Sequence, residues 1–202
     1  IILFGFSLYL SYYKYKDNHK EYKKKYLHKI KLLFISSIYI TLFTYIILPE
    51  QFIYFGILHF MCLSMIFLYY IINKYNILIF LLTILTILSI YMNDYENNNI
   101  TNNIVIGILG LGYYKRSMDH FKLLKWLNIV IIGILLGHIS INNKYISLKN
   151  NTSDKKNTNN IDDTNKLLVN LKWIGSNTLM LYNIHFPIIY IIIYYCFSRP
   201  YI

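Results

Sequence analysis

Residues 32–48 read LLFISSIYITLFTYIIL, a stretch of 17 residues without a charged side chain. As an α-helix this length lies at the short end of the ~17–25 residues that cross the hydrocarbon core of a bilayer. Pro49 follows directly, and its ring and missing N–H disfavour continuation of a helix. The stretch therefore predicts a membrane-spanning helix that ends near Leu48.

The composition extends this interpretation to the whole chain. Of its 202 residues, 56% are hydrophobic and only 14% are charged, whereas soluble domains carry about 25% charged residues. The deficit fits a lipid solvent, in which each charge is costly. Because the length suits one compact bundle, we expect residues 1–202 to form a single membrane domain.

Apolar runs separated by polar ones recur along the sequence. Because backbone polar groups cannot stay unpaired in lipid, such runs are expected to form helices. The sequence predicts an all-α fold, a polytopic transmembrane helix bundle of about six spans plus a short re-entrant or interfacial segment. The expected spans are residues 1–13, 32–48, 52–72, 77–92, 126–141 and 173–197, the last kinked by Pro187.

Two segments depart from this pattern. Residues 104–114 would form a helix of roughly 16 Å, about half of the ~30 Å hydrocarbon core, so we expect a re-entrant or interfacial segment there. Residues 142–166 are polar and of low complexity, which predicts a disordered loop. Within the expected fifth span, Gly133 and Gly137 form a small-xxx-small face suited to close helix packing.

The net charge of +11 is concentrated between the first two apolar stretches. Lysines there are typical of a cytoplasmic loop that obeys the positive-inside rule, so residues 49–52 and 93–103 are predicted to face outside. The alternative is a basic patch for nucleic acid or for a phosphorylated cofactor. No nucleic-acid motif is present, and we expect no nucleic-acid partner. The eight lysines are Lys14, Lys16, Lys20, Lys23, Lys24, Lys25, Lys29 and Lys31.

The chain begins at Ile1, inside an apolar run that is short for a span and that no charged segment precedes. The run does not resemble a signal peptide. We interpret it as the end of a span whose beginning is missing, so that the sequence is a fragment or has a misplaced gene start. Cys62 and Cys196 lie in apolar stretches; neither disulfide nor zinc spacing is present, and we expect no metal.

Ionisable side chains inside membrane segments are functional candidates by default. His59 lies about two turns into the expected third span. It is a candidate general base, because an unperturbed histidine titrates near pH 6.5. The alternative role for His59 is a hydrogen bond to another helix.

Polar side chains also mark the later spans. Thr178, Tyr182 and His185 fall on one face of a helix, where they line a substrate pocket or join helices. Asp119 precedes Trp126 at the start of the expected fifth span. It either binds a polar acceptor or marks the membrane interface.

Four stretches together resemble one family. Residues 55–64, FGILHFMCLS, resemble a helix that opens with Phe-Gly-Ile-Leu-His. Residues 117–137, SMDHFKLLKWLNIVIIGILLG, resemble Ser-x-Asp-Tyr-Phe-Pro-Leu-Leu-Pro-Trp before a glycine-bearing span. Residues 173–187, WIGSNTLMLYNIHFP, resemble Trp-x-Gly-x-x-Ser-Leu-x-x-Tyr-x-x-His-x-Pro, and residues 3–10, LFGFSLYL, a Phe-x-x-Gly-x-Ser-Leu stretch. The chain is similar, over nearly its whole length, to the catalytic region of heparan-alpha-glucosaminide N-acetyltransferase, among the transmembrane acyltransferases.

The resemblance implies a multi-pass protein of the cell membrane, surrounded by membrane lipids. It implies transfer of an acetyl group from cytosolic acetyl-CoA to an extracytoplasmic sugar or cell-envelope glycan. His59 and His185 would be catalytic and are expected to line one cavity, with His59 nearer the outer face. Substrate binding would fall to Asp119, Trp126, Asn177, Thr178 and Tyr182.

The sequence departs from the family at several positions. Lys122 and Lys125 replace two prolines, and Thr178 replaces a serine. The family's first helix, which carries an Arg-Gly pair and a histidine often assigned to catalysis, has no counterpart. Two alternatives are a transporter or flippase, in which the polar stripe lines a pathway, and an inactive remnant that only packs in the membrane.

Overall fold

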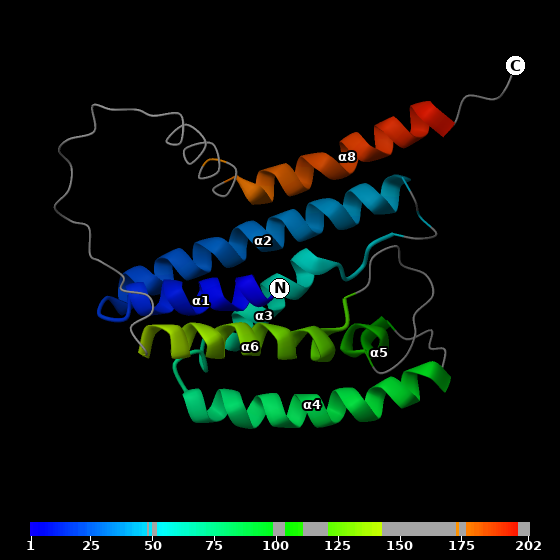
Figure 1. The fold of residues 1–202 in the computed structure, drawn as a ribbon. Helices are drawn as coiled ribbons and strands as arrows, with labels where there is room; N and C mark the ends of the chain where they lie inside the picture. Colours follow the sequence, from blue (N-terminus) through cyan, green and yellow to red (C-terminus); the bar gives the residue numbers. More distant parts are fainter. Residues whose placement is uncertain are drawn as a thin grey trace, which may run out of the picture. The chain divides into compact units, whose positions relative to one another are not determined.

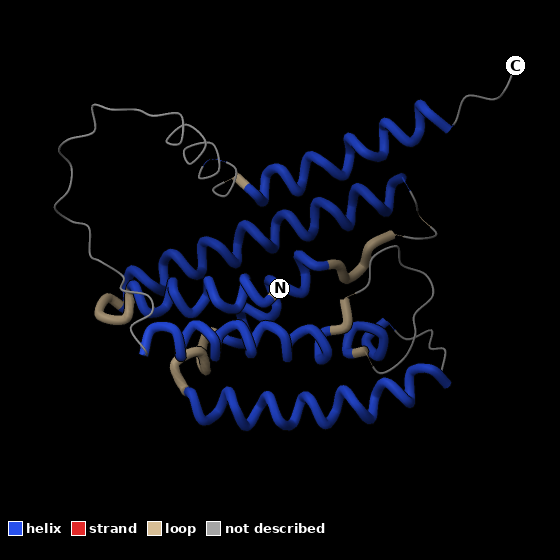
Figure 2. Tube along the Cα trace, viewed as in Figure 1, coloured by secondary structure: helices blue, strands red, loops and turns tan. Residues whose placement is uncertain are grey.

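The computed structural model describes residues 1–47, 49, 52–98, 104–110, 121–142, 173 and 177–197. They belong to two compact units, Ile1–Leu148 and Lys149–Ile202, and each unit is described by itself. All regular structure among the described residues is α-helical (Figure 1 and Figure 2). The all-α prediction is therefore confirmed.

Each described helix lies on or overlaps an expected apolar stretch, but α2 and α3 differ from the expected spans in their bounds. In the described part of the second unit, α8 (Thr178–Phe197) contains Pro187. The described helices of the first unit are α1 (Ile2–Lys14), α2 (His19–Ile47), α3 (Ile57–Leu68), α4 (Tyr75–Asn98), α5 (Ile104–Leu109) and α6 (Leu123–Asn142). The expected disordered loop lies, from residue 143 on, outside the described residues.

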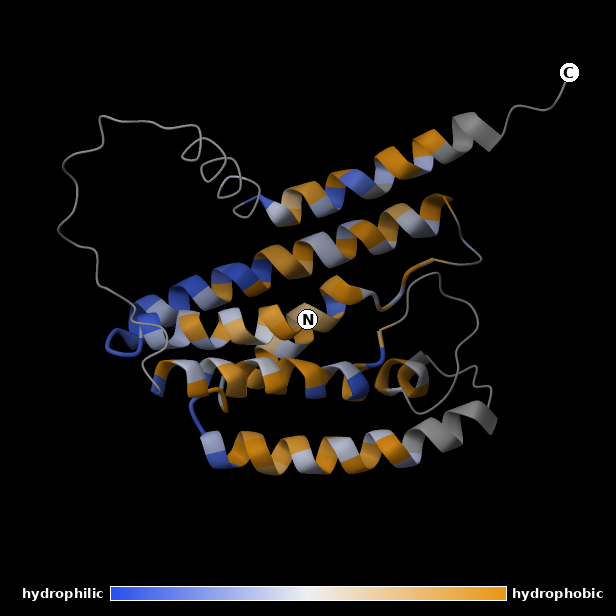
Figure 3. Ribbon diagram, viewed as in Figure 1, coloured by the Kyte–Doolittle hydropathy of each residue, from blue (hydrophilic) through white to orange (hydrophobic). Residues whose placement is uncertain are grey.

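The lysine-rich segment is mostly helical, which corrects the expected loop. Helix α2 runs from His19 into the apolar stretch without a break, and Figure 3 shows the change from hydrophilic to hydrophobic along it. Lysine is a good helix former. The side-chain oxygen of Asn18 accepts a hydrogen bond from the Glu21 N–H at 3.2 Å, which caps the first turn. Glu21 also pairs with Lys25, four residues later.

Helix α3 is shorter than the span expected over residues 52–72. It has 12 residues, about 18 Å in length, against a hydrocarbon core of ~30 Å. Among the described helices, α2 and α6 are long and apolar enough to cross a membrane, whereas residues 57–68, 75–91 and 178–192 form shorter apolar helices. The number of six spans therefore stays a prediction.

The outer faces of α2 and α4 are covered by large apolar side chains. Ile46 on α2 is 77% exposed and Ile90 on α4 is 69% exposed. Soluble monomers rarely expose contiguous apolar surface of this extent, so these faces fit contact with lipid. The exposed side chains are Leu32, Phe34, Ile35, Ile38, Tyr39, Leu42, Tyr45 and Ile46 on α2, and Ile77, Ile79, Phe80, Ile84, Ile87, Leu88, Ile90 and Tyr91 on α4.

Helices α1 and α6 pack at backbone distance, which confirms the small-xxx-small prediction. A Cβ atom added at Gly133 would collide with the carbonyl oxygen of Ile2. One added at Gly5 would collide with the carbonyl oxygen of Val130. Because neither glycine has a side chain, the two backbones touch, as small residues allow between membrane helices.

His138 lies at the end of the first unit that also holds Lys14 and the start of α2, here called the lysine end. Its ring centroid is 4.8 Å from that of Tyr75, the first residue of α4, and 5.3 Å from that of Tyr9 on α1. Helix α6 therefore runs antiparallel to α4, and α5 lies beside the start of α6 (Figure 1). This arrangement agrees with a short segment that does not cross the bundle.

Candidate active site

Two of the stretches singled out in the sequence meet at the end of the first unit opposite the lysine end. The backbone N–H of Phe121, just before α6, donates to the carbonyl oxygen of Phe55, just before α3, at 3.1 Å. The Phe121 ring also lies 5.8 Å from that of Phe60 and 5.2 Å from that of Trp126. The candidate residue Trp126 is therefore held beside the first turns of α3.

Helix α2 fixes the extended segment that leads into α3. The hydroxyl of Thr41 donates to the carbonyl oxygen of Ile53 at 2.9 Å. The N–H of Ile53 donates to Oγ1 of Thr44 at 3.1 Å. Thr41 and Thr44 are three residues apart and so share one helix face. Both backbone groups of Ile53, a buried residue, are thus satisfied by one face of α2.

His59 lies in the first turn of α3 and bonds in two directions. The N–H of Gly56, the residue before the helix, donates to its Nδ1 at 3.3 Å. Its Nε2 lies 3.1 Å from Oγ1 of Thr41 on α2. The side chain thus caps its own helix and contacts a neighbouring one, which is the hydrogen-bonding role that the sequence left open.

These two hydrogen bonds indicate which ring nitrogen of a neutral His59 carries the hydrogen. A neutral imidazole has one donor and one acceptor nitrogen. Nδ1 accepts from the backbone of Gly56, so Nε2 carries the hydrogen and donates to Thr41. The hydroxyl of Thr41 in turn donates a hydrogen bond to the carbonyl oxygen of Ile53. Gly56, His59, Thr41 and Ile53 therefore form one chain of hydrogen bonds in which both ring nitrogens are engaged, and a catalytic role for His59 stays a prediction.

The remaining candidate residues of the sequence lie on or beside α8, apart from Asp119, which is outside the described residues. Asn177 donates through Nδ2 to the carbonyl oxygen of Trp173 at 2.9 Å. The rings of Tyr182 and His185 touch edge to face, with centroids 4.8 Å apart. Tyr182, His185 and Thr178 therefore share one helix as expected. The cavity expected to join His185 with His59 spans the two units and stays a prediction.

Three polar residues of this region escaped the sequence analysis. Thr41 and Thr44 are uncharged and stand in an apolar stretch, where only their spacing on one helix face indicated a role. Asn128 on α6 is 7% exposed, and its Oδ1 has no hydrogen-bond partner among the described residues. A buried amide oxygen without a donor is costly, so Asn128 is a further candidate to hold a polar group.

Metal ligation has no support in the described part of the chain. No group of three or more His, Cys, Asp or Glu side chains is close enough there to hold a metal ion. Cys62 is buried, with its Sγ 3.8 Å from the carbonyl oxygen of Ile30. It packs as a small apolar side chain.

Two of the described helices are long and apolar enough to cross a membrane, and the exposed apolar faces of α2 and α4 fit contact with lipid, which favours a membrane-embedded helical protein. The family model for "Heparan-alpha-glucosaminide N-acetyltransferase, catalytic" matches residues 1–187, and the chain belongs to this family. The resemblance seen in the sequence is thereby confirmed. No curated protein and no solved structure matches the chain significantly.

Proposed function

We propose that this protein is a membrane acetyltransferase that moves an acetyl group from cytosolic acetyl-CoA to a sugar or glycan on the far side of the membrane. The observation that carries the proposal is the family match over residues 1–187. The structure supports it in one respect, because Phe55 and Phe121 join two of the family-like stretches at one place.

For this reaction the protein has to position the two substrates and assist one proton transfer. A thioester is already activated, so the amine or hydroxyl of the acceptor attacks its carbonyl carbon. The new C–N or C–O bond forms, the C–S bond breaks, and the proton of the acceptor ends on the thiolate of CoA. A positioned side chain that carries this proton typically contributes ~10²–10⁴ in rate, and alignment of the two substrates contributes further.

We assign His59 to the acceptor side of this reaction, in one of two roles. As a base it would take the proton at Nδ1 and give up the bond from Gly56. As a positioning residue it would keep both bonds and hold the acceptor in place while another group takes the proton. The two roles differ in their pH dependence, since only a base must lose its own proton before each turnover.

The remaining candidate residues complete the proposal. His185, in contact with Tyr182, would orient the acyl group together with Thr178. Asn177, Trp126 and Asp119 would bind the substrates. The chain would cross the cell membrane several times, with the lysine end in the cytoplasm.

The test uses the whole gene product in liposomes, with labelled acetyl-CoA on the lysine side and an amino sugar on the other side. We expect labelled N-acetyl sugar to form. His59→Ala should lower the rate by ~10²–10⁴. His28→Ala is a matched control, because His28 is an exposed histidine on α2 with no part in the site, and it should keep the wild-type rate.

The outcomes separate the proposal from its alternatives. Sugar that crosses the membrane without acetylation indicates a transporter, and neither transport nor transfer indicates an inactive remnant. A wild-type rate in His59→Ala removes His59 from the mechanism. A rate that falls at low pH in the wild type, but not in a slow His59→Gln variant, identifies His59 as the base.

A further inference from the structure

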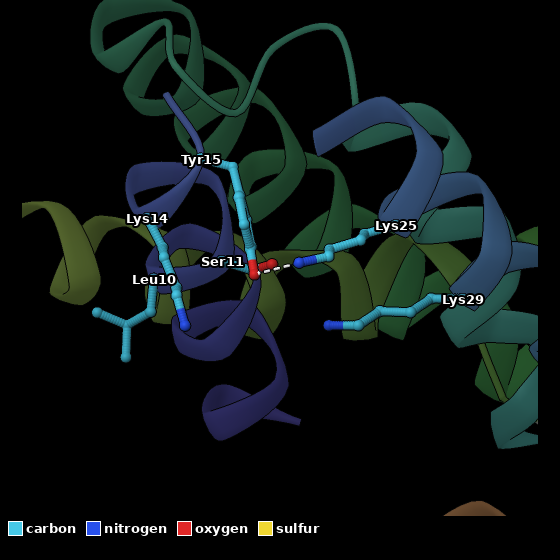
Figure 4. Close-up of a pocket in the computed structure, with 6 residues that line it drawn as sticks. All are labelled: Leu10, Ser11, Lys14, Tyr15, Lys25 and Lys29. Carbon is cyan, nitrogen blue, oxygen red and sulfur yellow. Dashed lines mark hydrogen bonds between the residues drawn. The ribbon is translucent and has the colours of Figure 1, made fainter. Parts of the chain in front are cut away.

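A pocket of about 430 Å³ opens at the lysine end, between the last turns of α1 and the lysine-rich half of α2 (Figure 4). The pocket and His59 lie at opposite ends of the first unit, and the acetyl transfer proposed above makes no use of the pocket. Three of its six lining residues carry an amine, and two carry a hydroxyl. The lining residues are Leu10, Ser11, Lys14, Tyr15, Lys25 and Lys29.

The central amine of the pocket is held in place. Nζ of Lys25 donates to the Tyr15 hydroxyl at 2.6 Å and lies 2.7 Å from Oε1 of Glu21. It also lies 4.1 Å from the centre of the Tyr15 ring. The hydrogen bond to Glu21, with that to Tyr15, raises the pKa of Lys25, so the amine keeps its positive charge at neutral pH.

The other two amines belong to Lys14 and Lys29, and Nζ of Lys14 lies 5.7 Å from the centre of the Tyr15 ring. Figure 4 shows the side chains of Lys14 and Lys29 pointing into the same space as Lys25, one from each helix. No carboxylate pairs with either of them in the part of the chain that the structure describes. Three ammonium groups and one carboxylate, that of Glu21, leave the pocket with an excess of positive charge.

The positions of the three lysines in the sequence explain why their charges gather at this pocket. Lys25 and Lys29 are four residues apart and therefore lie on one face of α2, and the turn at residues 15–18 folds that face back toward Lys14. Several ammonium donors around a small space, with hydroxyl donors beside them, are the usual recognition chemistry of a phosphate group. An apolar or a cationic ligand would leave these charges uncompensated.

We propose that the pocket between α1 and α2 binds a phosphate-bearing ligand through Lys14, Lys25 and Lys29. Two sources offer the same chemistry at a membrane surface. One is the nucleotide end of the CoA donor, and this source rests on the proposed function. The other is the headgroup of an anionic phospholipid, which needs no acetyl transfer.

The experiment compares two double variants of the whole protein in nanodiscs. Lys14→Gln with Lys29→Gln removes the two unpaired amines of the pocket. Lys20→Gln with Lys24→Gln removes two exposed lysines of α2 that do not line it, and so matches the change in net charge. Thermal unfolding of all three proteins shows whether each variant is folded, and Lys29→Gln alone replaces the pocket variant if that one is not.

The first arm measures binding of adenosine 3′,5′-bisphosphate to protein in neutral phosphatidylcholine. The second arm measures the enrichment of phosphatidylglycerol over phosphatidylcholine on purified protein. In at least one arm we expect the pocket variant to bind about tenfold more weakly than wild type, since it loses two charge-assisted hydrogen bonds to the phosphate. The control variant should stay within about threefold of wild type.

Each outcome decides the proposal. A specific loss in the first arm assigns the nucleotide, and one in the second arm assigns the lipid. Equal losses in the pocket and control variants, or none in either arm, overturn it. Binding without any acetyl transfer would leave the pocket in place and remove the proposed function.

Discussion

The hydroxyl oxygen of Thr41 lies 3.1 Å from Nε2 of His59, so a threonine in the longest described helix holds an imidazole at the start of another. The same hydroxyl donates to the carbonyl oxygen of Ile53. The side chain of Thr41 therefore helps to position both the ring of His59 and the segment that leads into α3.

Thr41→Val should remove both hydrogen bonds with little change in the shape of the side chain. The N–H at Nε2 of His59 and the carbonyl of Ile53 both lose their partner, which costs roughly 1–3 kcal/mol for each buried group. We expect a lower free energy of unfolding in mixed detergent micelles and slower acetyl transfer. Thr41→Ser keeps the hydroxyl and is the control. A loss in Thr41→Ser as large as that in Thr41→Val would show that the hydroxyl alone does not account for the effect, and wild-type values in Thr41→Val would contradict its role.

Two buried tyrosines of α2 provide a matched pair. The hydroxyl of Tyr26 donates to the carbonyl oxygen of Met65 at 2.7 Å, whereas the buried hydroxyl of Tyr22 has no hydrogen-bond partner among the described residues. Tyr26→Phe should lower the free energy of unfolding by about 1 kcal/mol, while Tyr22→Phe should be neutral or stabilising. Both variants can be measured by the same detergent unfolding assay. The opposite order would contradict the assigned bonds.

The two glycines of α6 should respond differently to alanine. Alanine favours a helix by about 1 kcal/mol over glycine, but at Gly133 its methyl group meets the backbone of α1, which cannot move aside. We expect Gly133→Ala to destabilise by roughly 1–3 kcal/mol. A Cβ added at Gly137 would lie 3.1 Å from Cβ and Cδ1 of Tyr9, so a small shift of a few tenths of an ångström relieves the contact. Thermal unfolding should therefore rank Gly137→Ala above Gly133→Ala, and equal stabilities would refute the close backbone contact.

The orientation in the membrane can be tested by cysteine labelling. The lysine end should face the cytoplasm, because eight lysines lie there, from Lys14 at the end of α1 to Lys31 before the apolar half of α2. In a background without Cys62 and Cys196, an impermeant reagent added outside should label Asn98→Cys and spare Lys24→Cys. Labelling of Lys115→Cys together with Asn98→Cys would place both ends of the segment between α4 and α6 on one side. A reversed pattern would invert the topology.

Much of the fold follows from hydrophobic runs, and the exceptions have physical causes. The run over residues 126–141 located α6 to within a few residues, because apolar side chains and helix ends coincide there. The lysine-rich segment was misread as a loop, since charge pattern reports the side of the membrane and not the backbone conformation. The short α3 was overestimated because Ile53 and Phe55 are apolar but not helical. Ile53 is held by Thr41 and Thr44 of α2, and Phe55 by the N–H of Phe121.

The candidate site was predicted less completely than the fold. Sequence alone identified His59, and it left a hydrogen bond to another helix open. It could not name Thr41 as the partner, because a threonine in an apolar run is usually bonded to its own helix, as Thr44 also is here. Which residues meet across helices depends on packing, which the sequence does not specify residue by residue.

The close contact of α1 with α6 also bears on how the protein is made. Helix α1 leaves the ribosome well before α6, because the backbone it fits belongs to a helix that begins only at Leu123. Until that helix is synthesised and inserted, Gly5 has no surface to meet, and α1 must wait in the bilayer or on a chaperone. Insertion of α6 would then be the committing step of assembly, and truncated chains that end before Leu123 should be recognised by membrane quality control.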